Sequence, residues 1–313
     1  MKRRWTGSGL QVKKGQMLRF LSLALLCLGP VACSSLPPPQ QAESSPIIHE
    51  PNLHDEVDKL IVLVPGAMAT VDIFSPVLGW DDSDSSILAF RFPGLDGLPL
   101  DHRVDILQSG AYIAEAVNRI RPKHLYLIGF STGGPVALEA ARRVETADVH
   151  VALVSSASSF PDTLVAAAEG AVDVASAFIR SGGTSMDAAW LENYRTLLYG
   201  RKHYDQPGLA EKSEALAEEQ RGHITTPSVK MTLAHTGSLM GWVYHPDPKL
   251  ERANIALFHG GDDNLFPLRR ARRFAGEIPA DAFYTYPEQG HLLFVTAPTL
   301  FDDIHRFFGL EDD

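Results

Sequence analysis

Six short, predominantly apolar stretches recur along the chain, and their apolar residues are mostly Val, Ile, Leu and Phe. Polar residues do not alternate with apolar ones in most of them, which is typical of strands that are buried on both faces. A parallel sheet covered by helices on both sides buries its strands in this way. The stretches are residues 60–64, 87–92, 125–130, 149–154, 255–258 and 282–286.

Amphipathic stretches lie between several of these runs. Their apolar residues recur at helical spacing, as Ile106, Ile113 and Val117 do. Alternation of strands and helices predicts an α/β fold with a doubly wound, mostly parallel sheet. The helical stretches are residues 104–119, 136–144, 269–278 and 300–308.

Residues 156–250 break the alternation, because they contain no convincing strand and several helical stretches. We expect a helical cap insertion there, between core segments at 58–155 and 251–313. Whether its apolar stripes pack on the core or face a substrate stays open, since the two look alike in sequence. One stripe is Leu164, Ala168, Val172, Ala175 and Ile179, and another is Trp190, Leu191, Tyr194 and Leu198.

The N-terminal segment is typical of a secretory signal peptide. A basic stretch at 2–19 precedes an apolar run at 20–28, and small residues follow it. The apolar run is too short to span a bilayer comfortably. Translation could start at Met1 or at Met17. We therefore expect an exported protein of a bacterial cell envelope.

The end of this segment resembles a bacterial lipobox. Residues 30–33 read Pro-Val-Ala-Cys, so Cys33 is the candidate lipidation site, although position 30 departs from the usual Leu. Ordinary signal cleavage near the same place is the alternative. We expect a signal peptide and lipobox at 1–33 and a flexible tether at 34–57, which is rich in Pro, Gln and Ser. A lipid anchor would place the protein on a membrane of the cell envelope, with the outer membrane as one option, and without it the protein would be periplasmic.

The charge and the cysteine content disfavour two classes of function and structure. The formal net charge is −10, from 28 basic and 38 acidic groups, which disfavours nucleic acid as a partner. Both cysteines, Cys27 and Cys33, lie near the N-terminus. The folded domain can therefore not be cross-linked by a disulfide or by a metal ion bound to cysteines.

The pentapeptide at 129–133, Gly-Phe-Ser-Thr-Gly, fits the pattern G-x-S-x-G. The pattern alone is weak, but here it follows a predicted strand and precedes a predicted helix. A serine at such a sharp turn stands clear of the sheet, with a helix N-terminus behind it that favours negative charge. Ser131 is therefore the candidate nucleophile.

Two later loops resemble those of the α/β-hydrolase family. Gly260, Asp263 and Pro267 fit its acid-bearing turn, and His291, after a glycine and before an apolar run, resembles its histidine loop. The resemblance covers roughly residues 58–308 and implies a triad of Ser131, Asp263 and His291. Asp262 is the second choice for the acid and is more readily read as a turn residue.

Hydrolysis of an acyl group also needs two N–H donors for the developing oxyanion. Thr132 directly follows the nucleophile and is expected to supply one. The other should come from the loop at 64–68, where Pro65 replaces the family's usual His. This leaves Ala67 or Met68 as the donor, and we choose Ala67.

The resemblance implies a serine esterase, similar to esterases and lysophospholipase-like enzymes, that needs no metal or organic cofactor. Its substrate would be a small-molecule or lipid ester. Peptidases, thioesterases and acyltransferases use the same three residues and remain alternatives. A hydrolase-fold lipoprotein without catalytic activity is an alternative of another class, which the intact set Ser131, Asp263 and His291 disfavours.

Overall fold

The structure is a computed structural model. It describes residues 36–49, 57–80, 85–183, 185–221 and 226–310, all within the compact unit Cys33–Asp313. The predicted signal peptide, with Met17 and Cys33, lies outside the described residues. In the part of the chain that is described, no helix has the length and apolar character needed to cross a membrane.

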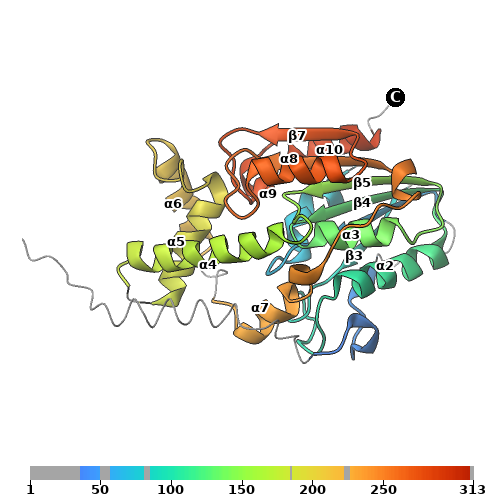
Figure 1. Cartoon of the computed structure of the whole chain (residues 1–313), viewed down its shortest axis with the longest axis horizontal. Helices are drawn as coiled ribbons and strands as arrows, with labels where there is room; N and C mark the ends of the chain where they lie inside the picture. Colours follow the sequence, from blue (N-terminus) through green and yellow to red (C-terminus); the bar gives the residue numbers. More distant parts are fainter. Residues whose placement is uncertain (1–35, 50–56, 81–84, 184, 222–225, 311–313) are drawn as a thin grey trace, which may run out of the picture. The chain divides into compact units, whose positions relative to one another are not determined.

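Within the described residues, seven strands form a single sheet in the order β1-β3-β2-β4-β5-β6-β7 (Figure 1). β1 is antiparallel to β3, and every other neighbouring pair is parallel. Each predicted apolar run overlaps one of the six parallel strands, so the predicted fold class is confirmed. The strands are β1 (Ile47–His49), β2 (Lys59–Val64), β3 (Ser85–Phe90), β4 (His124–Phe130), β5 (Asp148–Val154), β6 (Asn254–Gly260) and β7 (Ala282–Tyr286).

The direction of winding reverses at β2. The chain passes from β2 to β3 on one side, crosses back to β4 on the other side, and continues outward through β5, β6 and β7. In open α/β sheets, ligands bind where the winding reverses, outside the carboxyl ends of the strands. The topology therefore favours a site between the carboxyl ends of β2 and β4.

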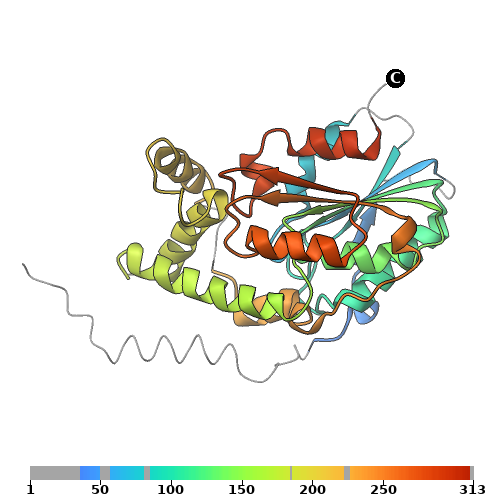
Figure 2. The same ribbon diagram turned by 45° about the horizontal axis from the view of Figure 1, so that its top comes forward.

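Helices cover both faces of the sheet (Figure 2). Successive residues of β2 point to opposite faces, so that Leu60, Val62 and Val64 belong to one hydrophobic cluster and Ile61 and Leu63 to the other. The first cluster is covered by α2 (Ile106–Ile120), α3 (Gly133–Ala141) and α8 (Leu268–Glu277), and the second by η2 (Val71–Gly79), α9 (Leu293–Thr296) and α10 (Leu300–Phe308).

The segment expected to be a flexible tether, 34–57, differs from that expectation in its described part. Residues 47–49 form β1 at the sheet edge, and a 3-10 helix, η1 (Pro39–Gln41), precedes them. The carbonyl of Pro37 accepts a hydrogen bond from the Arg103 backbone N–H at 2.8 Å. Backbone pairing of this kind holds the segment against the core although its composition is that of a linker.

Between β5 and β6, the described part of residues 156–250 contains helices and no strand. In Figure 1, α4, α5 and α6 lie beyond the end of the sheet to which the arrowheads of β5 and β7 point. The insertion therefore lies at the carboxyl end of the strands. Its helices are α4 (Asp162–Arg180), α5 (Met186–Tyr199), α6 (Leu209–Glu219) and α7 (Val229–Thr236), followed by the 3-10 turns η3 (Leu239–Gly241) and η4 (Leu250–Arg252).

The two apolar stripes of the insertion have different surroundings. On α4, Leu164, Val172 and Ile179 are 41%, 60% and 71% exposed, so this stripe faces solvent rather than the core. The opposite side of α4 is buried and includes Asp173. On α5, Leu198 is fully buried, and Tyr194 packs against the same cluster of the core.

Candidate active site

Ser131 lies at the turn between β4 and α3 and has a φ of 52°, which is strained for a residue other than glycine. Its N–H donates to the carbonyl of Val154 at 3.0 Å, and its carbonyl accepts from the N–H of Gly134 at 3.0 Å. A Cβ on Gly129 would lie 2.7 Å from the carbonyl oxygen of Gly133, so strand and helix meet closely here. The structure around the turn therefore holds Ser131 in its strained conformation.

The three side chains expected to act together are in hydrogen-bond contact. His291 Nε2 lies 3.1 Å from Ser131 Oγ, and His291 Nδ1 lies 2.8 Å from Asp263 Oδ2. They come from loops that follow β4, β6 and β7, whose carboxyl ends meet at one edge of the sheet. The His291 ring packs against the rings of Phe130 and Phe266, with centroids 5.1 and 5.5 Å away. The structure thus brings the three residues together in a buried site.

The Asp263 carboxylate accepts hydrogen bonds at both oxygens. Oδ1 accepts from the backbone N–H groups of Leu265 and Phe266 at 2.8 and 3.0 Å, and Oδ2 accepts from His291. Burial by itself would raise the pKa of this carboxyl. The neighbouring His291 and the donated hydrogen bonds outweigh that effect, and the pKa of Asp263 lies below its ordinary value. Asp263 is therefore ionised at neutral pH.

Two other residues of this turn have different partners. His259, which is buried, donates from Nε2 to the carbonyl of Phe266 at 2.7 Å, and this nitrogen is 3.7 Å from Asp263 Oδ2. Burial lowers the pKa of His259. Asp262 faces His203 instead of the site, at 3.3 Å. Among the described residues, no group of three or more His, Cys, Asp or Glu side chains is arranged to hold a metal ion.

The loop after β2 lies against Ser131. A Cβ on Gly66 would be 2.8 Å from the Cβ of Ser131, so the backbone of this loop passes too close to the serine for a side chain to fit between them. Within the described residues, no protein group accepts a hydrogen bond from the backbone N–H of Ala67 or of Thr132. The N–H of Met68, in contrast, donates to Nδ1 of His235 at 3.1 Å. Of the two loop amides that the sequence leaves open, that of Met68 is therefore already engaged.

The sequence of the chain was also compared with models of known protein families. Residues 61–304 match the profile described as "Alpha/beta hydrolase family", which is more than half of the chain. The chain belongs to the α/β-hydrolase family. A comparison with curated protein sequences found no match.

Solved α/β-hydrolase structures share this fold at low sequence identity. MGS-M2, an alpha/beta hydrolase enzyme from a Medee basin deep-sea metagenome library, is 14% identical with a TM-score of 0.60, and the match covers 85% of this chain and 95% of that chain. A structure from work on carboxylesterases of Nitrososphaera gargenis is 15% identical, with a TM-score of 0.58 and coverage of 85% and 98%. An enol-lactonase from Burkholderia xenovorans is 13% identical, with a TM-score of 0.60 and coverage of 85% and 95%. At these identities, the likeness shows the fold alone.

In this hydrolase, the end of α5 supports the histidine loop. The carbonyl of Leu197 accepts hydrogen bonds from the N–H groups of His291 and Leu292, at 2.7 and 3.1 Å. The carbonyl of Leu198 accepts from the N–H of Gly290 at 2.8 Å. A Cβ on Gly290 would overlap the carbonyl of Leu197, which explains why a glycine fits there. The insertion therefore fixes the backbone from which the imidazole projects.

The acid turn of the hydrolase also contacts the insertion. Asp173 on α4 is 1% exposed and accepts a hydrogen bond from Nδ2 of Asn264 at 2.6 Å. It forms an ion pair with Arg201 as well. Asn264 directly follows Asp263 in the chain. The buried carboxylate of Asp173 therefore fixes the acid turn from the side of the insertion.

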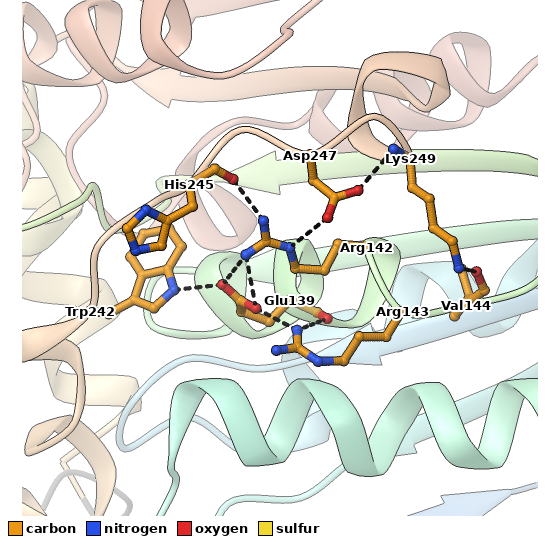
Figure 3. A network of polar contacts seen from close by, with 8 residues as sticks. All are labelled: Glu139, Arg142, Arg143, Val144, Trp242, His245, Asp247 and Lys249. Atoms are coloured by element: carbon orange, nitrogen blue, oxygen red, sulfur yellow. Dashed lines mark hydrogen bonds and ion pairs between the residues drawn. The ribbon is translucent and has the colours of Figure 1, made fainter.

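Helix α3, which follows the serine, is anchored by a buried carboxylate (Figure 3). Glu139 is 1% exposed, accepts from Trp242 Nε1 at 2.9 Å, and forms ion pairs with Arg142 and Arg143. Arg142 also lies 3.5 Å from Asp247. Trp242 and Asp247 belong to the last part of the insertion, so this network joins the insertion to α3.

The sequence did not single out His235, Asp173 or Glu139. Each contacts a partner far along the chain, at separations of 167, 91 and 103 residues. Motif spacing and helical periodicity report only on neighbours within a few turns, so neither marks these residues. The only sequence feature that could have marked these residues is a charged or imidazole side chain on the apolar face of a predicted helix. This feature indicates that the side chain is buried, but it does not identify the residue to which it binds.

Proposed function

We propose that this chain is a serine hydrolase that cleaves carboxylic acyl esters through an acyl-enzyme intermediate. The observation that carries the proposal is the buried series of hydrogen bonds from Ser131 Oγ through His291 to Asp263. A serine hydroxyl is a weak nucleophile unless a base within hydrogen-bond reach takes its proton. The distances of 3.1 and 2.8 Å are within that reach.

In the acylation step, Ser131 Oγ attacks the ester carbonyl carbon while its proton passes to His291 Nε2. The carbonyl electron pair moves to oxygen, and the N–H groups of Ala67 and Thr132 donate hydrogen bonds to the resulting oxyanion. Asp263 stabilises the imidazolium and holds its Nδ1–H. His291 then gives the proton to the leaving alkoxide oxygen as the C–O bond breaks, and the acyl group stays on Ser131.

In the deacylation step, a water molecule takes the place of the alcohol. His291 Nε2 accepts one proton from this water as its oxygen attacks the acyl carbon. The same two amides stabilise the second oxyanion. When the bond to Ser131 breaks, the proton returns from His291 to Ser131 Oγ, which restores the site and releases a carboxylic acid.

We further propose that the substrate is a lipidic or other acyl ester of the bacterial cell envelope, reached by export and by a lipid anchor on Cys33. The N-terminal sequence pattern and the apolar, aromatic-containing insertion support this. Replacing Cys33→Ala in the full chain should abolish metabolic labelling with a fatty acid and shift the protein out of the membrane fraction. Unchanged labelling in this variant would contradict the anchor.

A fluorophosphonate probe tests the proposed nucleophile. The purified protein should bind one probe molecule, as measured by intact mass, and Ser131→Ala should bind none. Ser155→Ala is the matched control, because Ser155 also follows a parallel strand and has a positive φ, 42°. This control should react like the unsubstituted protein. Equal labelling of Ser131→Ala and the unsubstituted protein would overturn the assignment.

A series of p-nitrophenyl esters of increasing acyl length tests the reaction. We expect turnover that Ser131→Ala reduces by about four to six orders of magnitude. Labelling at Ser131 without turnover at any acyl length would count against ester hydrolysis and direct the search to amides, thioesters or acyl acceptors other than water. Absence of both labelling and turnover would favour a non-catalytic role.

A further inference from the structure

We propose that His235, from the helical insertion, is a positioning residue for the oxyanion hole, because its bond to the Met68 amide fixes the loop that presents the Ala67 N–H to the substrate. This inference rests on the proposed hydrolase activity. It concerns a residue whose ring hydrogen bonds, within the described part of the chain, go to the backbone of Met68 and Pro93 and to none of the three proposed catalytic side chains.

The hydrogen bonds of His235 define which nitrogen carries the proton. Nε2 lies 2.7 Å from the carbonyl oxygen of Pro93, which can only accept, so Nε2 carries the hydrogen. The lone pair of Nδ1 is then free to accept the hydrogen bond from the Met68 N–H, at 3.1 Å. Burial lowers the pKa of His235, which keeps the ring neutral at neutral pH.

Helix α7 holds the ring in place. His235 is completely buried, and its ring meets that of Phe92 edge-on, with centroids 5.2 Å apart. The carbonyl of the preceding residue, Ala234, accepts from the Val104 N–H at 2.7 Å. The acceptor for Met68 is therefore supplied by a rigid part of the structure.

The loop needs such support because Met68 has an unfavourable backbone conformation. The N–H of Ala69 donates to the carbonyl of Gly66 at 3.2 Å, which closes a four-residue turn with Met68 at its third position. Met68 has a φ of 63°. A positive φ at this position is typical of a type II turn and favours glycine, whereas most other residues prefer a type I turn. The two turn types differ by a flip of the peptide that joins the second and third residues, here Ala67 and Met68.

The bond to His235 fixes the orientation of that peptide, since the Met68 N–H lies in its plane. Without the acceptor, the turn can relax toward the conformation that a methionine prefers. A Cβ on Gly66 would overlap Ser131, so this loop lies close to the serine. The Ala67 N–H belongs to the adjacent peptide of the same turn, and a shift of the turn displaces it relative to the attacking oxygen. An oxyanion-hole donor acts only when it is aimed at the position of the oxyanion. His235 thus raises the rate of the chemical step without binding the substrate.

Three variants separate the two hydrogen bonds of the ring. His235→Asn keeps an acceptor near the place of Nδ1, His235→Gln keeps a donor near the place of Nε2, and His235→Phe keeps only the aromatic volume. Steady-state kinetics on the best p-nitrophenyl ester should show near-normal kcat for His235→Asn. The kcat of the Gln and Phe variants should fall about 10- to 100-fold, with KM changing less than about threefold, as for partial loss of an oxyanion donor.

The double variant His235→Phe/Met68→Gly tests the mechanism. A glycine at 68 accepts a positive φ without strain, so the loss caused by His235→Phe should shrink in the Met68→Gly background. Equal kcat in all three single variants, or a loss in Asn as large as in Gln, would overturn the inference. So would a loss that appears only in KM. If His235→Phe does not fold, the Asn and Gln variants decide.

The role of His235 and the hydrolase activity itself are tested by different results. An unsubstituted protein that turns over no ester and binds no fluorophosphonate contradicts the hydrolase itself. An active unsubstituted protein whose His235 variants keep its kcat contradicts only the role of His235.

Discussion

Asp263 shows how one residue is kept charged where water is nearly excluded. Its side chain is buried, and its two oxygens accept hydrogen bonds from two backbone amides and from His291. A buried carboxylate without such donors would be neutral instead. Its neighbour Asp262, one residue earlier, faces His203 and lacks these partners. The sequence favoured Asp263 from the position of Gly260 and Pro267, and the structure shows the hydrogen bonds that distinguish the two.

Exchanging the two aspartates in turn gives a sharp prediction. Asp263→Asn should lower kcat by about 10⁴-fold, because an amide can no longer hold the Nδ1–H tautomer of His291 and stabilise its charge. Asp262→Asn, the matched control, should stay within a few-fold of the unsubstituted protein. Both variants are measured for kcat and thermal midpoint. A larger loss of kcat in Asp262→Asn than in Asp263→Asn would show that Asp262, and not Asp263, is the acid.

At the scale of elements, the insertion is joined to the site through several helices. The carboxyl end of α5 accepts hydrogen bonds from the histidine loop, α4 contacts the acid turn through Asp173, and α7 contacts the loop after β2 through His235. The last part of the insertion contacts α3 through Glu139. Each loop that carries a proposed catalytic group is therefore held from both the sheet and the insertion.

The Glu139 network predicts a measurable loss of stability. Glu139→Gln removes the charge that two partly buried arginines share, so we expect the free energy of unfolding to fall by about 1–3 kcal/mol. Glu115→Gln on α2 is the control. Glu115 and Arg119 form an i,i+4 pair with side chains 70% and 72% exposed. Such a surface pair contributes less than about 1 kcal/mol. Urea unfolding measures both variants, and equal losses would show that burial adds nothing to the Glu139 contacts.

At the scale of the whole molecule, the parallel strands were predictable because burial on both faces leaves unbroken apolar runs. The proposed nucleophile, acid and base were predictable because each lies in a short motif directly after a strand. Strand β1 was not predictable from the sequence, because it has only three residues, lies in a linker-like segment and is held by backbone pairing. The exposure of Val172 and Ile179 was not predictable either, because periodicity shows that a stripe exists and not what it faces. The partner of His235 lies 167 residues away, beyond any local pattern.

The buried histidines predict how stability depends on pH. Burial lowers the pKa of both His235 and His259 below the ordinary 6.5. Below pH 6.5 the unfolded chain therefore binds protons that the folded protein excludes, and the free energy of unfolding should fall as the pH decreases. Each histidine contributes at most about 1.4 kcal/mol per pH unit. Asp263 acts in the same direction only below its ordinary pKa of 3.8.

Urea unfolding at pH 7.5 and 5.5 measures this dependence. The unsubstituted protein should lose stability between the two pH values, and His235→Asn should lose less, because it lacks one of the two histidines whose pKa is lowered by burial. A larger loss of unfolding free energy in His235→Asn, or a gain in stability of the unsubstituted protein at pH 5.5, would contradict the lowered pKa values assigned to the buried histidines.

The carbonyls at the end of α5 have a consequence for protein engineering. Exchanging the insertion as a cassette with that of a relative is an obvious route to a new substrate range. Here such a graft would replace the two carbonyls that accept hydrogen bonds from the N–H groups of Gly290 and His291, so the proposed base would shift wherever the incoming helix ends in a different place. Redesign of this hydrolase should therefore keep the insertion's backbone and vary its side chains.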